Sequence, residues 1–179
     1  MTTLTAEGRR VTVGARATVA AWVAMIGVDL LLHAGLLAPL YDWEGPFLLS
    51  PEEAFVRIPA GYLAFAVLAA GLAWLLPRLG VRGVRAGAMA GAGIGAAAWG
   101  ALLLGIWSIA SAEPQLLLAW WGGQTAQLAV GGAVIGAAGA GAPVSRLAWV
   151  AAGLLVGGLA AAVGLQSIGY APAPIRIGG

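Results

Sequence analysis

The chain has 179 residues, of which 61% are hydrophobic and only 9% are charged, and its formal net charge is +2. A soluble domain carries about 25% charged residues, so this composition excludes an ordinary soluble domain, a nucleic-acid module and a disordered tail. With no cysteine and one histidine, the chain also lacks the residues for disulfides, thiolate metal sites and multi-histidine metal centres. We therefore expect an integral membrane protein.

Five apolar stretches are each long enough to cross a bilayer, which takes about 20 helical residues. Turn residues or charges separate these stretches, which we place at 17–40, 58–76, 84–110, 115–141 and 147–168. The sequence thus predicts an all-α polytopic protein with one transmembrane domain over residues 17–168. An arm (1–16) precedes this domain and a tail (169–179) follows it. The first stretch is predicted to be a retained helix, because it is longer than the apolar region of a signal peptide.

The placement of arginine predicts the orientation of these helices. One side of the predicted membrane carries Arg9, Arg10, Arg16, Arg78, Arg82, Arg85 and Arg146. The other side has only Arg57 and Arg176, together with Asp42, Glu44, Glu52, Glu53 and Glu113. Because positive residues accumulate on the cytoplasmic side, we expect the N-terminus in the cytoplasm and the C-terminus outside. The expected location is the cell membrane (inner or plasma).

The longest polar connection, residues 41–57, contains a helix-start signal. Ser50-Pro51-Glu52-Glu53 reads as a capping box with proline at the first helical position. It predicts a short helix near 51–57 at the outer interface, either an anchor for the loop or a lid over a cavity. Aromatic residues expected at headgroup depth are Tyr41, Trp43, Phe47, Tyr62, Trp120 and Trp121.

Glycine spacing predicts how the helices pack. The chain has 29 glycines, and several repeat at intervals of four: Gly87, Gly91 and Gly95; Gly132 and Gly136; Gly153 and Gly157. Small residues at this spacing let helix backbones approach closely in a membrane. We therefore expect Gly/Ala-rich faces to hold the bundle together.

Asp29 and His33 are the most informative residues in the chain. Their spacing places them on one face of the first helix, and Asp29 lies about midway between Arg16 and Tyr41, near the predicted bilayer midplane. A carboxylate at that depth costs at least about 2.5–3.5 kcal/mol and normally faces the bundle interior. This pair is therefore the candidate ligand- or proton-binding site.

Polar residues of other helices fall at compatible depths. Gln124 and Gln127 would reach the layer of Asp29 and His33, while Ser108 and Gln166 would line a cavity that opens outward. Trp99 and Trp107 could stack on an apolar ligand. For the glutamines the alternative is a purely structural role as interhelical hydrogen-bond partners, and for the tryptophans it is packing. No metal ligand set and no catalytic motif can be named.

The chain shows two resemblances to known membrane proteins, one in its overall architecture and one in a local sequence pattern. Small size, five predicted spans and many tryptophans resemble the translocator family of tryptophan-rich sensory proteins. The loop Tyr41-Asp42-Trp43-Glu44-Gly45-Pro46 departs from that family's Trp-x-Pro-Pro signature, so its ligands are not carried over. The stretch from Asp29 to His33, followed by Pro39 and Tyr41, is similar to a pattern in small bacterial membrane proteins and implies no activity.

The leading functional hypothesis is a membrane transporter or binding protein for a small solute or protons, centred on Asp29 and His33. The alternative is an accessory or scaffold subunit of a larger respiratory or photosynthetic membrane complex, in contact with a tetrapyrrole or lipid. An intramembrane enzyme acting on lipid is the least favoured hypothesis, because no nucleophile accompanies the pair. Expected partners are the lipid bilayer and either a second copy of the chain or a larger complex.

Overall fold

A computed structural model describes residues 4–41 and 47–171. Within these residues, the fold consists of five long helices: α1 (Leu4–Leu31), α2 (Pro51–Arg78), α3 (Val84–Ile109), α4 (Pro114–Gly139) and α5 (Val144–Ser167). A π-helical turn, η1 (Leu32–Leu36), and a 3-10 turn, η2 (Ala38–Leu40), continue α1. The predicted all-α class is confirmed, and most helix boundaries lie within a few residues of those expected.

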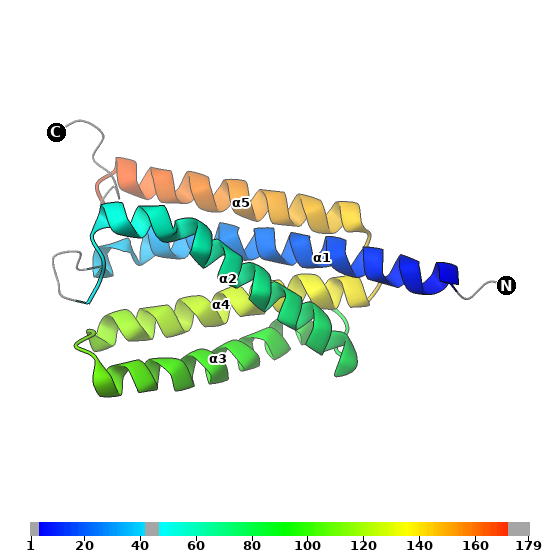
Figure 1. The fold of residues 1–179 in the computed structure, drawn as a ribbon. Coiled ribbons are helices and arrows are strands. Elements are labelled where there is room, and N and C mark those ends of the chain that lie inside the picture. The colour runs from blue at the N-terminus through cyan, green and yellow to red at the C-terminus, as the bar shows by residue number, and fades with distance from the viewer. Residues whose placement is uncertain (1–3, 42–46, 172–179) are drawn as a thin grey trace.

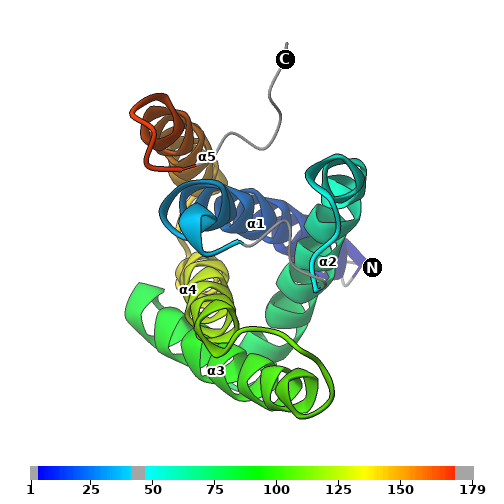
Figure 2. The same cartoon turned by 90° about the vertical axis from the view of Figure 1, so that its left-hand side faces the viewer.

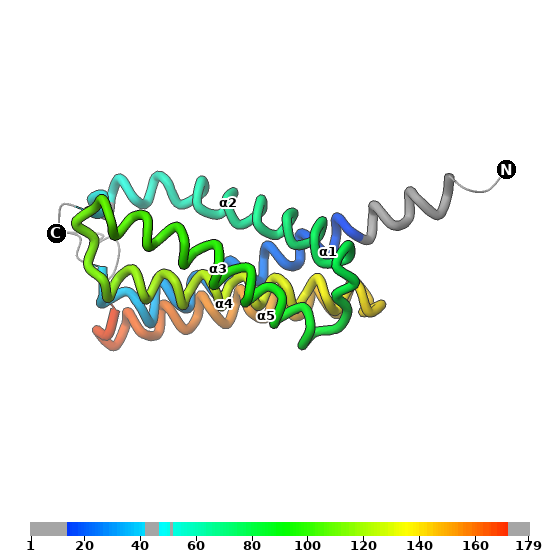
Figure 3. The backbone as a smooth tube through the Cα atoms, turned by 90° about the horizontal axis from the view of Figure 1, so that it is seen from below, coloured from blue at the N-terminus to red at the C-terminus, as the bar shows by residue number. Residues whose placement is uncertain are grey.

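The helices form an elongated bundle in which consecutive helices alternate in direction (Figure 1). Viewed from one end, α1 lies near the centre, with α2, α4 and α5 around it (Figure 2). Helix α3 packs mainly on α4, on the side away from α1, and the view from below shows the same long axis (Figure 3). Helix α4 therefore lies between α1 and α3.

Four segments of the described chain are long and apolar enough to cross a membrane. They are Gly14–Leu36, Glu52–Arg78, Val84–Ile109 and Val144–Ser167. Helix α4 is not among them, because Gln124, Thr125 and Gln127 lower its hydropathy. It is nevertheless the most buried of the five helices, with both glutamines inside the bundle. Gln124 and Gln127 are thus covered by the other helices.

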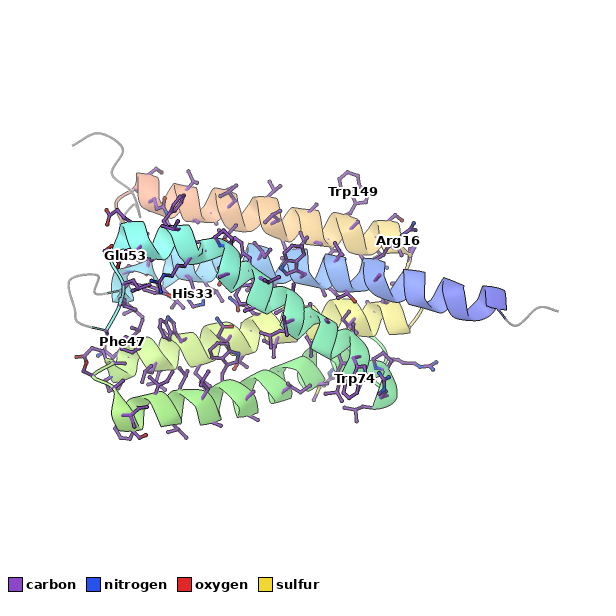
Figure 4. All side chains as sticks on the ribbon, viewed as in Figure 1. Arg16, His33, Phe47, Glu53, Trp74 and Trp149 are labelled. Carbon is purple, nitrogen blue, oxygen red and sulfur yellow. The ribbon has the colours of Figure 1, made fainter. Side chains whose placement is uncertain are left out.

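The outer surface of the bundle is strongly apolar. Large hydrophobic side chains face outward from α2, α3 and α5, with Ile109 87% exposed and Trp149 79% exposed. Monomeric soluble proteins rarely expose apolar surface of this extent. Charged groups lie instead at the ends of the bundle, with Arg16 at one end and Glu53 at the other (Figure 4).

The N-terminus of α2 confirms the predicted cap but not the predicted short helix. The Ser50 hydroxyl accepts a hydrogen bond from the backbone N–H of Glu53 at 3.3 Å, and Pro51 is the first helical residue. The expectation of a separate helix near 51–57 was wrong, because α2 continues without a break through Pro59 to Arg78. A proline withholds only one helix N–H, and this loss does not end the helix. Trp43 of the predicted aromatic belt lies outside the described residues.

The predicted glycine faces of α3 and α4 pack against each other. A Cβ atom on Gly87 would collide with the carbonyl oxygen of Gly132, and one on Gly91 with that of Leu128. The N–H of Gly83, which precedes α3, donates to the carbonyl of Gly136 at 2.7 Å. These backbones approach so closely that only glycine fits between them.

The glycine prediction for α5 was wrong. Added Cβ atoms on Gly153 and Gly157 would meet nothing within 4 Å, whereas one on Gly158 would collide with the backbone of Gly27 on α1. Helix α5 turns the face with Ala151, Gly158 and Ala162 toward the bundle. Gly153 and Gly157 lie away from that face, so the close crossing of α1 and α5 uses a different register.

Candidate functional site

The site begins at a change of helix type. At η1 the hydrogen bonding widens by one residue, so that the N–H of Leu37 donates to the carbonyl of Leu32 at 2.7 Å. Side chains of the α5 end of the chain bind this turn: Gln166 Nε2 donates to the carbonyl of Ala34 at 3.0 Å, and the Tyr170 hydroxyl donates to that of Leu36 at 3.3 Å. Single π turns occur frequently at functional sites, and this one contains His33.

Asp29 is bound from the neighbouring helix by Gln127. The amide Nε2 of Gln127, on α4, donates to Oδ1 of Asp29 at 2.7 Å. His33 Nε2 lies 3.9 Å from the same oxygen, and neither side chain of the pair is more than one-fifth exposed. The structure thus brings together three of the predicted site residues.

Tyr41 extends this group toward the end of the bundle. Its hydroxyl lies 2.6 Å from His33 Nδ1 and accepts a hydrogen bond from Trp120 Nε1 at 2.9 Å. With the hydroxyl hydrogen directed at Nδ1, His33 carries its own hydrogen on Nε2, where it faces Asp29. This nitrogen is buried and has no hydrogen-bond partner in the described part of the chain. Trp120, Tyr41 and His33 are joined by hydrogen bonds, and Asp29 follows across a 3.9 Å gap. We call these four residues the Tyr41–Asp29 chain.

Tyr41 remains uncharged over the ordinary pH range. Burial raises the pKa of its hydroxyl to about 12; the negative charge of Asp29 adds to this effect, and the Trp120 hydrogen bond opposes it. The hydroxyl therefore acts as a hydrogen-bond donor and acceptor rather than as a charge.

A cavity of about 310 Å³ adjoins these residues. Helix α1 with its two following turns forms one wall, and the first half of α2 forms another, while α5 contributes one residue. Asp29 is the single charged residue among the described ones that line it. The lining also includes His33, Tyr41, Gly61, Tyr62, Phe65 and Gln166.

The remaining predicted site residues lie elsewhere. Gln124 is buried, and its Oε1 atom lacks a hydrogen-bond partner in the described chain, but it does not line the cavity. Ser108 is exposed and donates to the carbonyl of Gly105 on its own helix. Trp99 packs in a separate apolar cluster, and Trp107 lines an apolar groove between α3 and α4. Because α4 separates α3 from α1, no α3 residue reaches Asp29.

Several residues of the site or of the adjoining cavity were missed by sequence reasoning. Tyr41 and Trp120 were expected only as interfacial aromatics, and Gly61 and Phe65 carried no signal. The sequence did contain a signal for Trp120. Trp120, Gln124 and Gln127 follow the i, i+4, i+7 spacing of residues on one helix face.

His33 offers no open position for a tetrapyrrole iron in this arrangement. Its Nδ1 atom meets Tyr41, and its Nε2 atom faces Asp29 and lies close to the backbone of Gly123. The described residues also bring together no three His, Asp or Glu side chains that could hold a metal ion. The group is therefore suited to proton exchange and to binding positive charge.

No protein-family model, curated protein or solved structure matches this chain. Its fold and site define an all-helical bundle with a buried carboxyl, imidazole and phenol in series, and the function must be argued from this chemistry.

Proposed function

We propose that this chain is a polytopic cell-membrane protein that binds a proton or a small solute at Asp29 and His33, as a transporter or a binding protein. The apolar exterior and the four sufficiently apolar helices support a membrane location. Helix α4 joins the end of α3 to the start of α5 at the opposite end of the bundle (Figure 1). If α3 and α5 both cross the membrane, α4 crosses it as well, which gives five spans.

The distribution of charge supports the orientation of the proposed membrane protein. Arg78, Arg82, Arg85 and Arg146 lie at or near the helix ends that share one end of the bundle. Arg16, within α1, lies level with the same end (Figure 4). By the positive-inside rule, this end faces the cytoplasm. The Tyr41–Asp29 chain then enters the bundle from the outer side.

The observation that carries the functional proposal is a buried carboxyl with no cationic partner. Within the described chain, the one potentially cationic group close to the Asp29 carboxyl is His33, at 3.9 Å. The one hydrogen bond to Asp29 comes from the neutral amide of Gln127. Interhelical hydrogen bonds in membranes contribute about 0.6 kcal/mol on average. That is less than the roughly 2.5–3.5 kcal/mol cost of an acidic residue at the helix centre. Because stability alone does not explain the buried carboxyl of Asp29, its presence supports a binding role.

The order of the polar groups supports proton exchange. Tyr41 lies beyond the last turn of α1, His33 in the π turn, and Asp29 inside the bundle. Neutral imidazole carries one hydrogen and one lone pair on its two nitrogens, so it can accept a proton on one side and release one on the other. His33 can therefore take up a proton on one nitrogen and release one from the other, with Tyr41 bound at Nδ1 and Asp29 3.9 Å from Nε2.

The test is infrared difference spectroscopy on the purified chain between acidic and alkaline pH. A protonated Asp29 gives a carboxyl C=O band that Asp29→Asn removes and that Glu113→Gln, at the exposed end of α4, leaves in place. Circular dichroism and gel filtration serve to check that both variants fold. If a folded Asp29→Asn protein keeps every pH-dependent carboxyl band, Asp29 does not bind protons and the proton-binding proposal fails.

A second candidate function is an accessory or scaffold subunit of a larger membrane complex. The observation that favours it is the outward face of α5, where Gly153 and Gly157 meet no other helix. Purification in mild detergent tests it: stoichiometric partner subunits would support this role, and a self-sufficient protein would contradict it.

A further inference from the structure

We propose that the cavity beside Asp29 binds a small organic ammonium ion in exchange for the Asp29 proton. The inference rests on the proposed function, since it assigns a ligand class to the same carboxyl.

The charges around the cavity select a cation. The titratable groups that face Asp29 are His33 in η1, Tyr41 beyond η2 and Tyr62 on α2. Helices α4 and α5 contribute only the neutral amides of Gln127 and Gln166. None of the arginines in the described part of the chain lines the cavity, so an anion would find no permanent positive charge there. Gln127 occupies Oδ1 of Asp29, and no hydrogen bond from the described residues reaches Oδ2.

The lining suits an organic cation better than a calcium or magnesium ion. Calcium and magnesium take six or more oxygen ligands, and Asp29 is the one carboxylate that the cavity offers. Aromatic rings of Tyr41, Tyr62 and Phe65 form much of the remaining wall, with the last two rings 6.3 Å apart. The faces of such rings attract ammonium groups. A volume of 310 Å³ corresponds to about ten water molecules, which suits a small ligand.

Exchange follows from the presence of a single carboxyl. Asp29 can hold a proton or neutralise an ammonium ion, but it cannot do both. Ammonium binding at acidic pH must therefore release the Asp29 proton. Below the carboxyl pKa, the apparent ammonium affinity falls about tenfold for each pH unit.

The probe is tetraethylammonium chloride, because a quaternary ammonium has no proton of its own, so every proton released comes from the protein. Binding to the purified full chain in detergent is measured by calorimetry between pH 5 and 9, and proton release is measured with a pH indicator in weak buffer. Gly61→Leu is the informative variant: Gly61 lines the cavity, and a Cβ on it would meet nothing within 4 Å. The leucine thus fills the cavity without displacing the backbone. Gly71→Leu on the same helix, equally open but outside the cavity, is the matched control.

The expected result is tetraethylammonium binding that strengthens with pH, releases a proton at acidic pH and weakens at least tenfold in Gly61→Leu but not in Gly71→Leu. The carboxyl infrared band of Asp29 persists in both leucine variants. If wild-type protein shows that band but binds no tetraethylammonium, or binds it without proton release, the ammonium inference is overturned and the proposed function stands. Equal affinity in Gly61→Leu and Gly71→Leu would place any binding outside this cavity and would also overturn the inference.

Discussion

The hydroxyl of Tyr41 connects two parts of the chain that are far apart in sequence. It meets His33 on the segment that precedes it and Trp120 near the start of α4. Pro39 and the 3-10 turn fold the chain back so that Tyr41 covers the imidazole. Position in the sequence predicts an aromatic residue near the membrane surface, but it does not show that the ring turns inward to meet His33.

Burial of Tyr41 predicts a loss of stability at high pH. The unfolded chain releases the tyrosine proton near pH 10, whereas the folded protein retains it to about pH 12. Stability should thus be unaffected by Tyr41 below pH 10 and should fall between pH 10 and about 12. Tyr41→Phe should flatten this decline in thermal unfolding followed by circular dichroism between pH 8 and 12. Tyr170→Phe, which removes a half-exposed hydroxyl, is the control; an undiminished decline in Tyr41→Phe would contradict the assignment.

At the level of helices, glycine spacing predicted one contact and failed on another for a definite reason. On α3 and α4 the repeating glycines named from the sequence, such as Gly87 and Gly132, are the ones that meet the neighbouring backbone, although Gly131 beside them faces Met25 on α1. Helix α5 carries Gly153, Gly157 and Gly158 in two competing registers, and only the shape of α1 around Gly27 decides between them. The π turn was not predictable either, because its widened hydrogen bonding depends on contacts with α5.

The crossing of α1 and α5 gives a paired prediction. Gly158→Ala places a methyl group against the backbone of Gly27, which cannot move aside as a side chain could. We expect the free energy of unfolding to fall by about 1–3 kcal/mol. Gly157→Ala, one residue earlier and open on its outer side, should leave stability unchanged or raise it by up to roughly 1 kcal/mol. Denaturant unfolding in mild detergent measures both; similar effects of the two alanines would contradict the observed register.

For the whole molecule, counting residues along each helix predicted how deep a side chain lies along the bundle axis. It did not predict toward which neighbouring helix that side chain points. The sequence therefore placed Asp29, Gln127 and Gln166 at compatible levels, and the structure brings all three close to η1 or the cavity. The same counting placed Ser108 near that level, although α3 lies behind α4 and turns it away. Which helices are neighbours depends on packing between segments far apart in sequence, and hydropathy does not encode that.

The path of α4 decides whether the bundle has five membrane spans, and the absence of native cysteine makes this measurable with single introduced cysteines. Ser111 lies exposed between α3 and α4, and Ser145 lies exposed in the first turn of α5. We expect a membrane-impermeant maleimide to label Ser111→Cys in intact cells and to label Ser145→Cys only after the membrane is opened. If α4 lay along one surface instead of crossing, both cysteines would be on the same side and would react alike. Labelling of both variants in opened membranes shows that each cysteine is reactive, so that protection of Ser145→Cys in intact cells reports its side of the membrane.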